Sequence, residues 1–290
     1  MAELHPSGPV GRQLPDGRLH LQHGPIDLII EAFGDAAEVR LAYRQAWQRF
    51  QDVLATLVEE LPLLWRAVDD GHPGVAGPVA RRMLAACRPH AGIFITPMAA
   101  VAGAVADEIL AALLAGRSLS KAYVNNGGDI ALHVAAGESL AVGVVGDVDC
   151  PSVDGVATIT AAMSARGIAT SGWRGRSFSL GIADAATVLA NDAAAADAAA
   201  TLVANAIDLD HGSIKRSRAC DLDETSDLGA RLVTTEVGWL EPEHVERALR
   251  NGAACAEAMR RAGLIHGAVL VLQRQIRVVG DVVPRLLSAA

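Results

Sequence analysis

Apolar residues recur at helical spacing in three stretches of the chain. Residues 36–61 carry apolar side chains on one face and charged ones on the other, and Pro62 follows, so we predict one helix there. Gly77 and Pro78 open a second predicted helix, which runs through Cys87. A third, amphipathic helix is predicted over residues 242–262, before Gly263.

Strand patterns occupy the middle and the end of the chain. The links between them are of hairpin length, which favours an antiparallel or mixed sheet over repeated βαβ units. The predicted strands are residues 26–32, 122–124, 130–135, 139–145, 156–162 and 167–169, an ordered stretch at 233–238, and a closing hairpin of 268–272 and 276–279 across residues 273–275.

Small residues dominate two further predicted helices. Thr96 stands at an N-cap position before Pro97, and the helix that starts there can receive an anion at its first turn, while its later turns pack on a sheet. Asn191 and Asp192 cap an alanine-rich helix. We expect an irregular arm over residues 1–24 and a single domain over residues 25–290. The polar stretch 207–227 is expected to lie outside the core.

Composition narrows the functional classes. The chain has 290 residues, 51% of them hydrophobic but only 3% aromatic, so close helix-on-sheet contacts through alanine are expected. The net charge of −8, without a basic run, argues against nucleic acid or an anionic membrane as partner. The N-terminus has no apolar signal core and no run is read as long enough to span a bilayer, so a cytoplasmic protein is expected.

The four cysteines, Cys87, Cys150, Cys220 and Cys255, form no CxxC pair and predict separate reduced thiols. Three histidines in the N-terminal arm, His5, His20 and His23, are read as surface residues or as ligands of a metal or substrate. The expected partner is a small molecule, and a homodimer is left open.

Three short phrases combine small residues with a carboxylate or a hydroxyl: residues 125–130 (NNGGDI), 169–172 (ATSG) and 196–201 (ADAAAT). The paired glycines Gly127 and Gly128 let a ligand approach main-chain N–H groups. Asp197 and Thr201, four residues apart on a helix, place two oxygens on one face. Together the phrases can frame a phosphate and its metal.

A loop follows Ser171, and it contains two arginines. Arg174 and Arg176 can bind a phosphate or carboxylate, and they can equally be solvated loop residues. Ser177 lies beside them, and Asp184 comes after the loop as a candidate general base.

The order of these phrases resembles the ApbE superfamily, the FAD:protein FMN transferases, and most of all a poorly characterised cytoplasmic branch of it. The small-residue phrase 97–104, the Gly-Gly-Asp-Ile, a Ser-x-Ser-x-Gly before residues 183–185 and the Ala-Asp-Ala at 196–198 carry the resemblance, which is strong over residues 26–207 and weak beyond. It implies an α+β, T-fold-related architecture of mixed or antiparallel sheets flanked by alanine-rich helices.

The resemblance also implies a flavin nucleotide, FAD or FMN, beside Mg²⁺. The loop ending in Asp129 corresponds to the segment against the nucleotide, and Asp197 and Thr201 match the metal-binding pair. The residues expected to bind the cofactor are Thr96, Met98, Asn126, Gly127, Gly128, Asp129, Thr170 and Ser171, and those expected at the chemistry are Asp184, Ser177, Arg174 and Arg176.

One departure from the family pattern keeps alternatives open. The transferases follow the Ala-Thr-Ser-Gly phrase with a His-x-x-Asp-Pro segment, whereas residues 177–184 here contain no histidine. Three functions therefore remain: an Mg²⁺-assisted enzyme acting on a flavin or another phosphorylated molecule; a metabolic enzyme for a small anionic substrate, in sulfur or heterocycle metabolism, on the same scaffold; and a non-catalytic flavin-binding or assembly protein.

Overall fold

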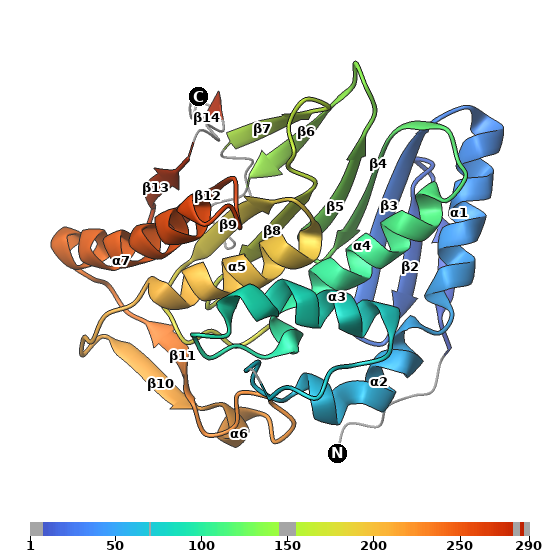
Figure 1. The fold of residues 1–290 in the computed structure, drawn as a ribbon. Coiled ribbons are helices and arrows are strands. Elements are labelled where there is room, and N and C mark those ends of the chain that lie inside the picture. The colour runs from blue at the N-terminus through green and yellow to red at the C-terminus, as the bar shows by residue number, and fades with distance from the viewer. Residues whose placement is uncertain (1–7, 70, 145–154, 281–284, 287–290) are drawn as a thin grey trace.

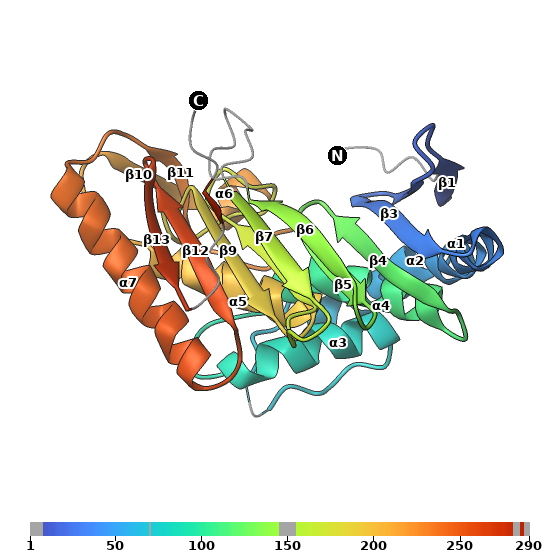
Figure 2. The ribbon, with the colours of Figure 1, turned by 90° about the horizontal axis from the view of Figure 1, so that it is seen from above.

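A nine-stranded antiparallel sheet forms the centre of the molecule. The structure is a computed structural model that describes residues 8–69, 71–144, 155–280 and 285–286. The strand order is β1-β2-β3-β4-β5-β8-β9-β12-β13, and every pair is antiparallel. Helices cover one face of this sheet (Figures 1 and 2). The predicted α+β class with antiparallel sheets is confirmed.

The strands from β3 onward follow the predicted pattern. Alternate residues of β3 are buried, as a half-covered strand requires, whereas β9 and β12 are buried at every position. Their bounds are β3 Ile26–Gly34, β4 Leu119–Asn126, β5 Asp129–Val134, β8 Gly167–Ser171, β9 Ala185–Ala190, β12 Gly267–Leu272 and β13 Gln275–Val279. The last hairpin turns on two residues, Gln273 and Arg274, both with positive φ, rather than on three.

The N-terminal segment is not an irregular arm. β1 (Val10–Gln13) and β2 (Leu19–His23) pair with each other, and β2 continues the sheet beside β3. Leu19 and Leu21 are buried, and His20 between them hydrogen-bonds Asp27 of β3 at 3.0 Å. Short strands interrupted by Pro, Gly and His give too little periodic signal to be recognised without their partner strand.

The first predicted helix is two helices in the structure. α1 (Ala36–Phe50) begins at Asp35, whose carboxylate accepts hydrogen bonds from the amides of Ala37 and Glu38. The helix is interrupted by a turn at Gln51 and Asp52. The second helix, α2 (Val53–Leu64), contains Pro62 instead of ending before it. Pro62 lies in the last turn of α2, where its missing N–H removes one helical hydrogen bond without stopping the helix.

The helices that lie against the sheet are α1, α4 (Val101–Leu114), α5 (Ala193–Ala206) and α7 (Pro242–Arg261), and α3 (Pro78–Cys87) packs on α4 and α5. Glycines allow the closest approaches. A Cβ on Gly103 of α4 would lie 2.2 Å from the Ala193 carbonyl oxygen, and one on Gly167 of β8 would lie 2.0 Å from the Asp192 carbonyl oxygen. α5 is therefore held directly against both α4 and β8.

Two small sheets complete the fold. β6 (Ser139–Val144) pairs with β7 (Gly155–Thr160), and β7 also pairs with β14 (Arg285–Leu286). Leu132, Leu140 and Ile159 belong to a second apolar cluster on that side. The strand predicted over residues 139–145 corresponds to β6. Its predicted last residue, Val145, lies outside the described residues, as does Cys150.

The segment after α5 contributes to the core, contrary to its polar composition. Ile207 and Ala219 are fully buried, and Leu209 is largely buried. β10 (Ile214–Arg218) pairs with β11 (Leu232–Val237), with the short α6 (Ala219–Leu222) between them. A few apolar residues spaced among many charged ones are sufficient to anchor the segment.

The stretch Pro97–Leu114 corrects the expectation that no run can span a bilayer. It comprises the short 3₁₀ helix η2 (Pro97–Ala100) and α4, its mean hydropathy is 1.7, and half of it is buried inside the protein. By length and composition it could cross a membrane. Core helices pass the same test, so this is weak support for a membrane protein.

Candidate functional site

The Gly-Gly phrase forms the turn between β4 and β5. Gly127 and Gly128 have φ of 65° and 112°, which side-chain-bearing residues rarely adopt. The side-chain oxygen of Asn125 accepts a hydrogen bond from the Gly128 amide at 2.8 Å. Asn126 is buried, and its amide nitrogen donates to the Ala102 carbonyl at 3.1 Å. The turn is thus fixed to the first turn of α4.

Asp129 opens β5 directly after this turn. Its carboxylate accepts a hydrogen bond from the Thr170 amide of β8 at 3.3 Å. The side chain is half-buried, and burial raises the pKa of Asp129 to about 7, with the Thr170 amide acting in the opposite direction. The carboxylate therefore gains and loses its proton near neutral pH.

Asp197 of α5 is the second carboxylate of the site. It accepts a hydrogen bond from the Gly103 amide at 3.0 Å. Burial and then the negative charge of Asp129 raise the pKa of Asp197 well above its usual value. α5 packs on β5, so the two carboxylates, 68 positions apart in the sequence, lie near enough for the charge of Asp129 to act on Asp197. Thr201 follows one helical turn later and is half-buried.

The start of α4 differs from the prediction. The residues after Thr96 form the 3₁₀ turn η2, α4 begins at Val101, and its first amides are bound by Asp197. The group at this helix start is therefore a carboxyl group of the protein itself, and not an external anion. The Thr96 hydroxyl makes no capping bond and donates to Asp227 instead. Met98 packs against the main core.

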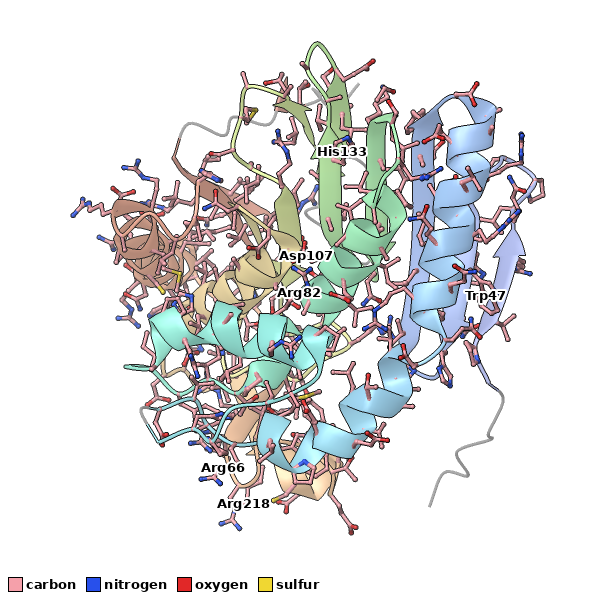
Figure 3. All side chains as sticks on the ribbon, turned by 45° about the vertical axis from the view of Figure 1, so that its right-hand side comes forward. Trp47, Arg66, Arg82, Asp107, His133 and Arg218 are labelled. Atoms are coloured by element: carbon pink, nitrogen blue, oxygen red, sulfur yellow. The ribbon has the colours of Figure 1, made fainter. Side chains whose placement is uncertain are left out.

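Asp107 is a half-buried carboxylate that the sequence did not single out. Its two oxygens accept hydrogen bonds from the amides of Ala193 and Ala194, at 3.0 and 2.8 Å, so it caps α5 (Figure 3). Burial raises the pKa of Asp107 to about 6. α4 and α5 thus cap each other, and no local pattern distinguishes Asp107 from Glu108 beside it in α4.

The opposite face of the sheet holds a hollow of about 290 Å³ beside the same glycine turn. Strand alternation explains the two faces: Asn126 points toward α4, and so Asn125 points away from it. Arg176 reaches into the hollow, and one of its nitrogens donates to the Pro25 carbonyl at 2.7 Å. The lining residues are Asp27, Ile29, Asn125, Gly127, Gly128 and Arg176.

Thr170 and Ser171 fall on different faces. The Thr170 hydroxyl is 2.8 Å from the Thr187 hydroxyl on the neighbouring strand β9, and the Thr170 amide donates a hydrogen bond to Asp129. Ser171, next along β8, points to the helix side by strand alternation. Thr170 therefore contributes to the site through its main chain.

The loop residues that were expected to be catalytic mostly contact one another or solvent. Asp184 accepts hydrogen bonds from the Trp173 indole at 3.2 Å and from the Gln273 amide at 2.6 Å. Arg174 stacks on Trp173 and lies 3.9 Å from Asp184. Ser177 is exposed. These contacts give Asp184 a role in fixing the loop, and its role as a general base stays a prediction.

The donor set fits a magnesium ion. Asp129 and Asp197 are neighbouring carboxylates whose raised pKa values record burial without an opposite charge, which a cation would supply. Carboxylate and hydroxyl oxygens are the ligands that Mg²⁺ prefers, and it keeps water or phosphate in its other positions. Asp129, Asp197 and Thr201 would hold the ion.

Comparison with known proteins identifies a family for this chain. A family model described as "AbpE bacteria" matches residues 11–278. A UPF0280 protein of Archaeoglobus fulgidus is 41% identical over 106 residues, which is 35% of this chain and 40% of that relative, so the match spans less than half of the relative's length.

Solved structures of low identity are also similar. A point mutant of the flavin transferase ApbE of Vibrio cholerae is 11% identical over 95% of this chain and 98% of its own, with a TM-score of 0.46. The ApbE protein of Thermotoga maritima is 12% identical over 94% and 96%, with a TM-score of 0.47. The family model, which covers most of the chain, carries the assignment: this protein belongs to the ApbE-like family that the model describes.

Proposed function

We propose that this protein is an ApbE-like enzyme that acts on a flavin nucleotide or another phosphorylated, anionic small molecule with the help of Mg²⁺. One observation carries the proposal. Asp129 and Asp197, from distant parts of the chain, are held side by side with raised pKa values, next to a turn made of two glycines. Carboxyl groups with strongly perturbed pKa values cluster at functional sites.

The surrounding residues supply what a phosphorylated ligand requires. The glycine turn lies between the carboxylate pair on one face of the sheet and the hollow with the positive charge of Arg176 on the other, and it has no side chains to keep a ligand from the backbone. The amides of Gly103 and Thr170 hold the two carboxylates in place. When bound, Mg²⁺ would neutralise charge on the phosphate groups.

A second candidate function rests on the loop after β8. Residues 177–184 contain no histidine, and Asp184 is already bound by Trp173 and Gln273. Transfer of flavin to a protein needs a group to accept the target hydroxyl proton, and this loop does not supply a free one of that kind. A metabolic enzyme for a small anionic substrate, using the same carboxylates and Arg176, is the alternative.

Flavin turnover separates the candidates. Purified protein is incubated with FAD and Mg²⁺, and AMP release and flavin fluorescence are followed. The proposal in its flavin form expects Mg²⁺-dependent AMP release that Asp197→Asn abolishes and the exposed-site control Asp223→Asn retains. Flavin binding without turnover identifies a flavin-binding protein, and Mg²⁺ binding without flavin binding favours the alternative enzyme.

Absence of both flavin and divalent-metal binding would contradict the proposed site altogether. Because Asn can keep the hydrogen bond from the Gly103 amide through its side-chain oxygen, the Asp197→Asn variant is expected to fold.

A further inference from the structure

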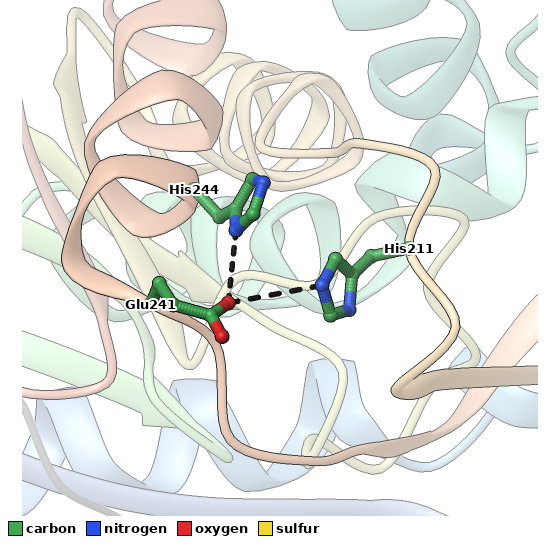
Figure 4. Close-up of side chains that lie close together, drawn as sticks. All are labelled: His211, Glu241 and His244. Carbon is green, nitrogen blue, oxygen red and sulfur yellow. Dashed lines mark hydrogen bonds and ion pairs between the residues drawn. The ribbon is translucent and has the colours of Figure 1, made fainter.

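A group of two histidines and one glutamate lies at the start of α7, apart from the carboxylate pair (Figure 4). One oxygen of Glu241 is 3.0 Å from Nδ1 of His244 and 3.8 Å from Nε2 of His211. The three ligand atoms lie within 4.8 Å of one another. Glu241 is exposed and both histidines are half-buried, so water reaches the group.

The topology explains why these residues meet. β10 and β11 are antiparallel, so the residues just before β10 and just after β11 lie at the same end of the hairpin. His211 precedes β10, and Glu241 follows β11 as the residue that opens α7. The Gly238 amide donates to the Ser213 carbonyl at 2.8 Å, which fixes the two segments to each other.

We propose that His211, Glu241 and His244 form a binding site for a zinc-class divalent cation. Two imidazole nitrogens and one carboxylate oxygen, with a fourth position left to water, are a ligand set that Zn²⁺ accepts. Ligand atoms about 2.0 to 2.1 Å from a tetrahedral Zn²⁺ are about 3.3 Å apart. The two distances from Glu241, 3.0 and 3.8 Å, bracket that value, so side-chain adjustments are sufficient.

Binding requires two hydrogen bonds to open. The hydrogen bond between Nδ1 of His244 and Glu241 must give way to bonds from both atoms to the ion. Nδ1 of His211 accepts a hydrogen bond from the Ser213 amide at 3.1 Å, an arrangement that leaves the proton of the neutral ring on Nε2. To bind a cation through Nε2, the ring must move this proton to Nδ1 and release the Ser213 amide to water. The site is therefore of moderate affinity, and its occupant ties the β10–β11 hairpin to α7.

This site differs in chemistry from the carboxylate pair. Nitrogen-rich ligands select Zn²⁺ or Co²⁺, whereas the oxygen ligands of Asp129 and Asp197 suit Mg²⁺. The two sites can therefore be titrated separately in the same protein.

The test uses the full chain without a polyhistidine tag. Zn²⁺ and Co²⁺ are titrated by calorimetry and by visible absorption, and thermal unfolding is recorded with and without each ion. We expect one bound ion, the intense visible bands of tetrahedral Co²⁺, and a higher unfolding temperature with Zn²⁺. His244→Ala and Glu241→Gln are each expected to weaken binding at least about tenfold.

His266→Ala is the matched control, because His266 is a partly exposed histidine that bonds Asn191 on another surface. It should bind Zn²⁺ as the wild type does. Zn²⁺ binding that is unchanged in both His244→Ala and Glu241→Gln, weak octahedral Co²⁺ bands, or no binding in the wild type would each overturn the proposal. Both variants replace solvent-accessible side chains, and their unfolding temperatures without metal verify that they fold.

Discussion

Replacing Asp129 by asparagine tests the repulsion within the carboxylate pair. Burial raises the pKa of Asp129 from 3.8 to about 7, a rise of about three pH units. At 1.36 kcal/mol per unit, keeping this group ionised in the folded protein costs about 4 kcal/mol. Asparagine has the shape of the neutral acid and can still accept the Thr170 amide hydrogen bond, so it avoids this cost.

The sign follows from proton binding. The folded protein holds the Asp129 proton between pH 4 and 7 while the unfolded chain does not, so stability falls as pH rises through this window and levels off above it. Asp129→Asn should therefore be more stable than the wild type at pH 8 and about equal to it at pH 4. The side chain is partly exposed and its charge state depends on that of Asp197, so we expect less than this cost, about 2 to 3 kcal/mol, or about 3 to 5 °C.

Thermal and urea unfolding at pH 4 and pH 8, without divalent metal, measure the difference. Mg²⁺ should stabilise the wild type at pH 8 and leave Asp129→Asn unchanged, which narrows the gap between them. Asp223→Asn is the control, since hydrogen bonds from Thr225 lower the pKa of that exposed carboxylate and its substitution should not stabilise the protein. An Asp129→Asn protein that is less stable than the wild type at pH 8 would refute the reasoning.

Three further predictions concern neighbouring residues. Asp107→Asn should lose stability by about 1 to 3 kcal/mol in urea unfolding, because one amide of α5 then faces an NH₂ group, yet it should keep the Mg²⁺ response; loss of that response would show that Asp107 belongs to the metal site. Gly103→Ala should destabilise the fold by about 3 kcal/mol or more, since the new Cβ would lie 2.2 Å from the Ala193 oxygen; a neutral result would contradict the tight α4–α5 contact. Arg176→Ala should weaken binding of a phosphorylated ligand about tenfold in calorimetry with little change in unfolding temperature, and equal affinity would remove Arg176 from the site.

The sequence predicted the parts of the site that depend on local chemistry. The Gly127 and Gly128 turn, the cap of α5 at Asp192 and the placement of Asp197 on that helix all follow from residue type and spacing. The resemblance of the ordered phrases to a known family also predicted that Asp129 and Asp197 belong to one site, and in the structure the charge of Asp129 acts on Asp197.

What the sequence did not predict depends on partners distant in the chain. Asp107 caps a helix 86 positions away, and no local pattern marks it. Thr96 has the residue type of an N-cap, but Asp227 takes its hydroxyl, and Asp197 takes the amides of α4. β1 is a strand because β2 pairs with it, not because of its own composition. Tertiary contacts override local preference in each case.

Diffraction from crystals soaked in Mn²⁺, a substitute for Mg²⁺ with a strong anomalous signal, tests the central claim most directly. The account predicts an anomalous peak between the carboxylates of Asp129 and Asp197 at pH 8, absent in Asp197→Asn crystals. A carboxylate pair that stays without a peak at millimolar Mn²⁺, or a peak that persists at the same place without Asp197, would contradict it.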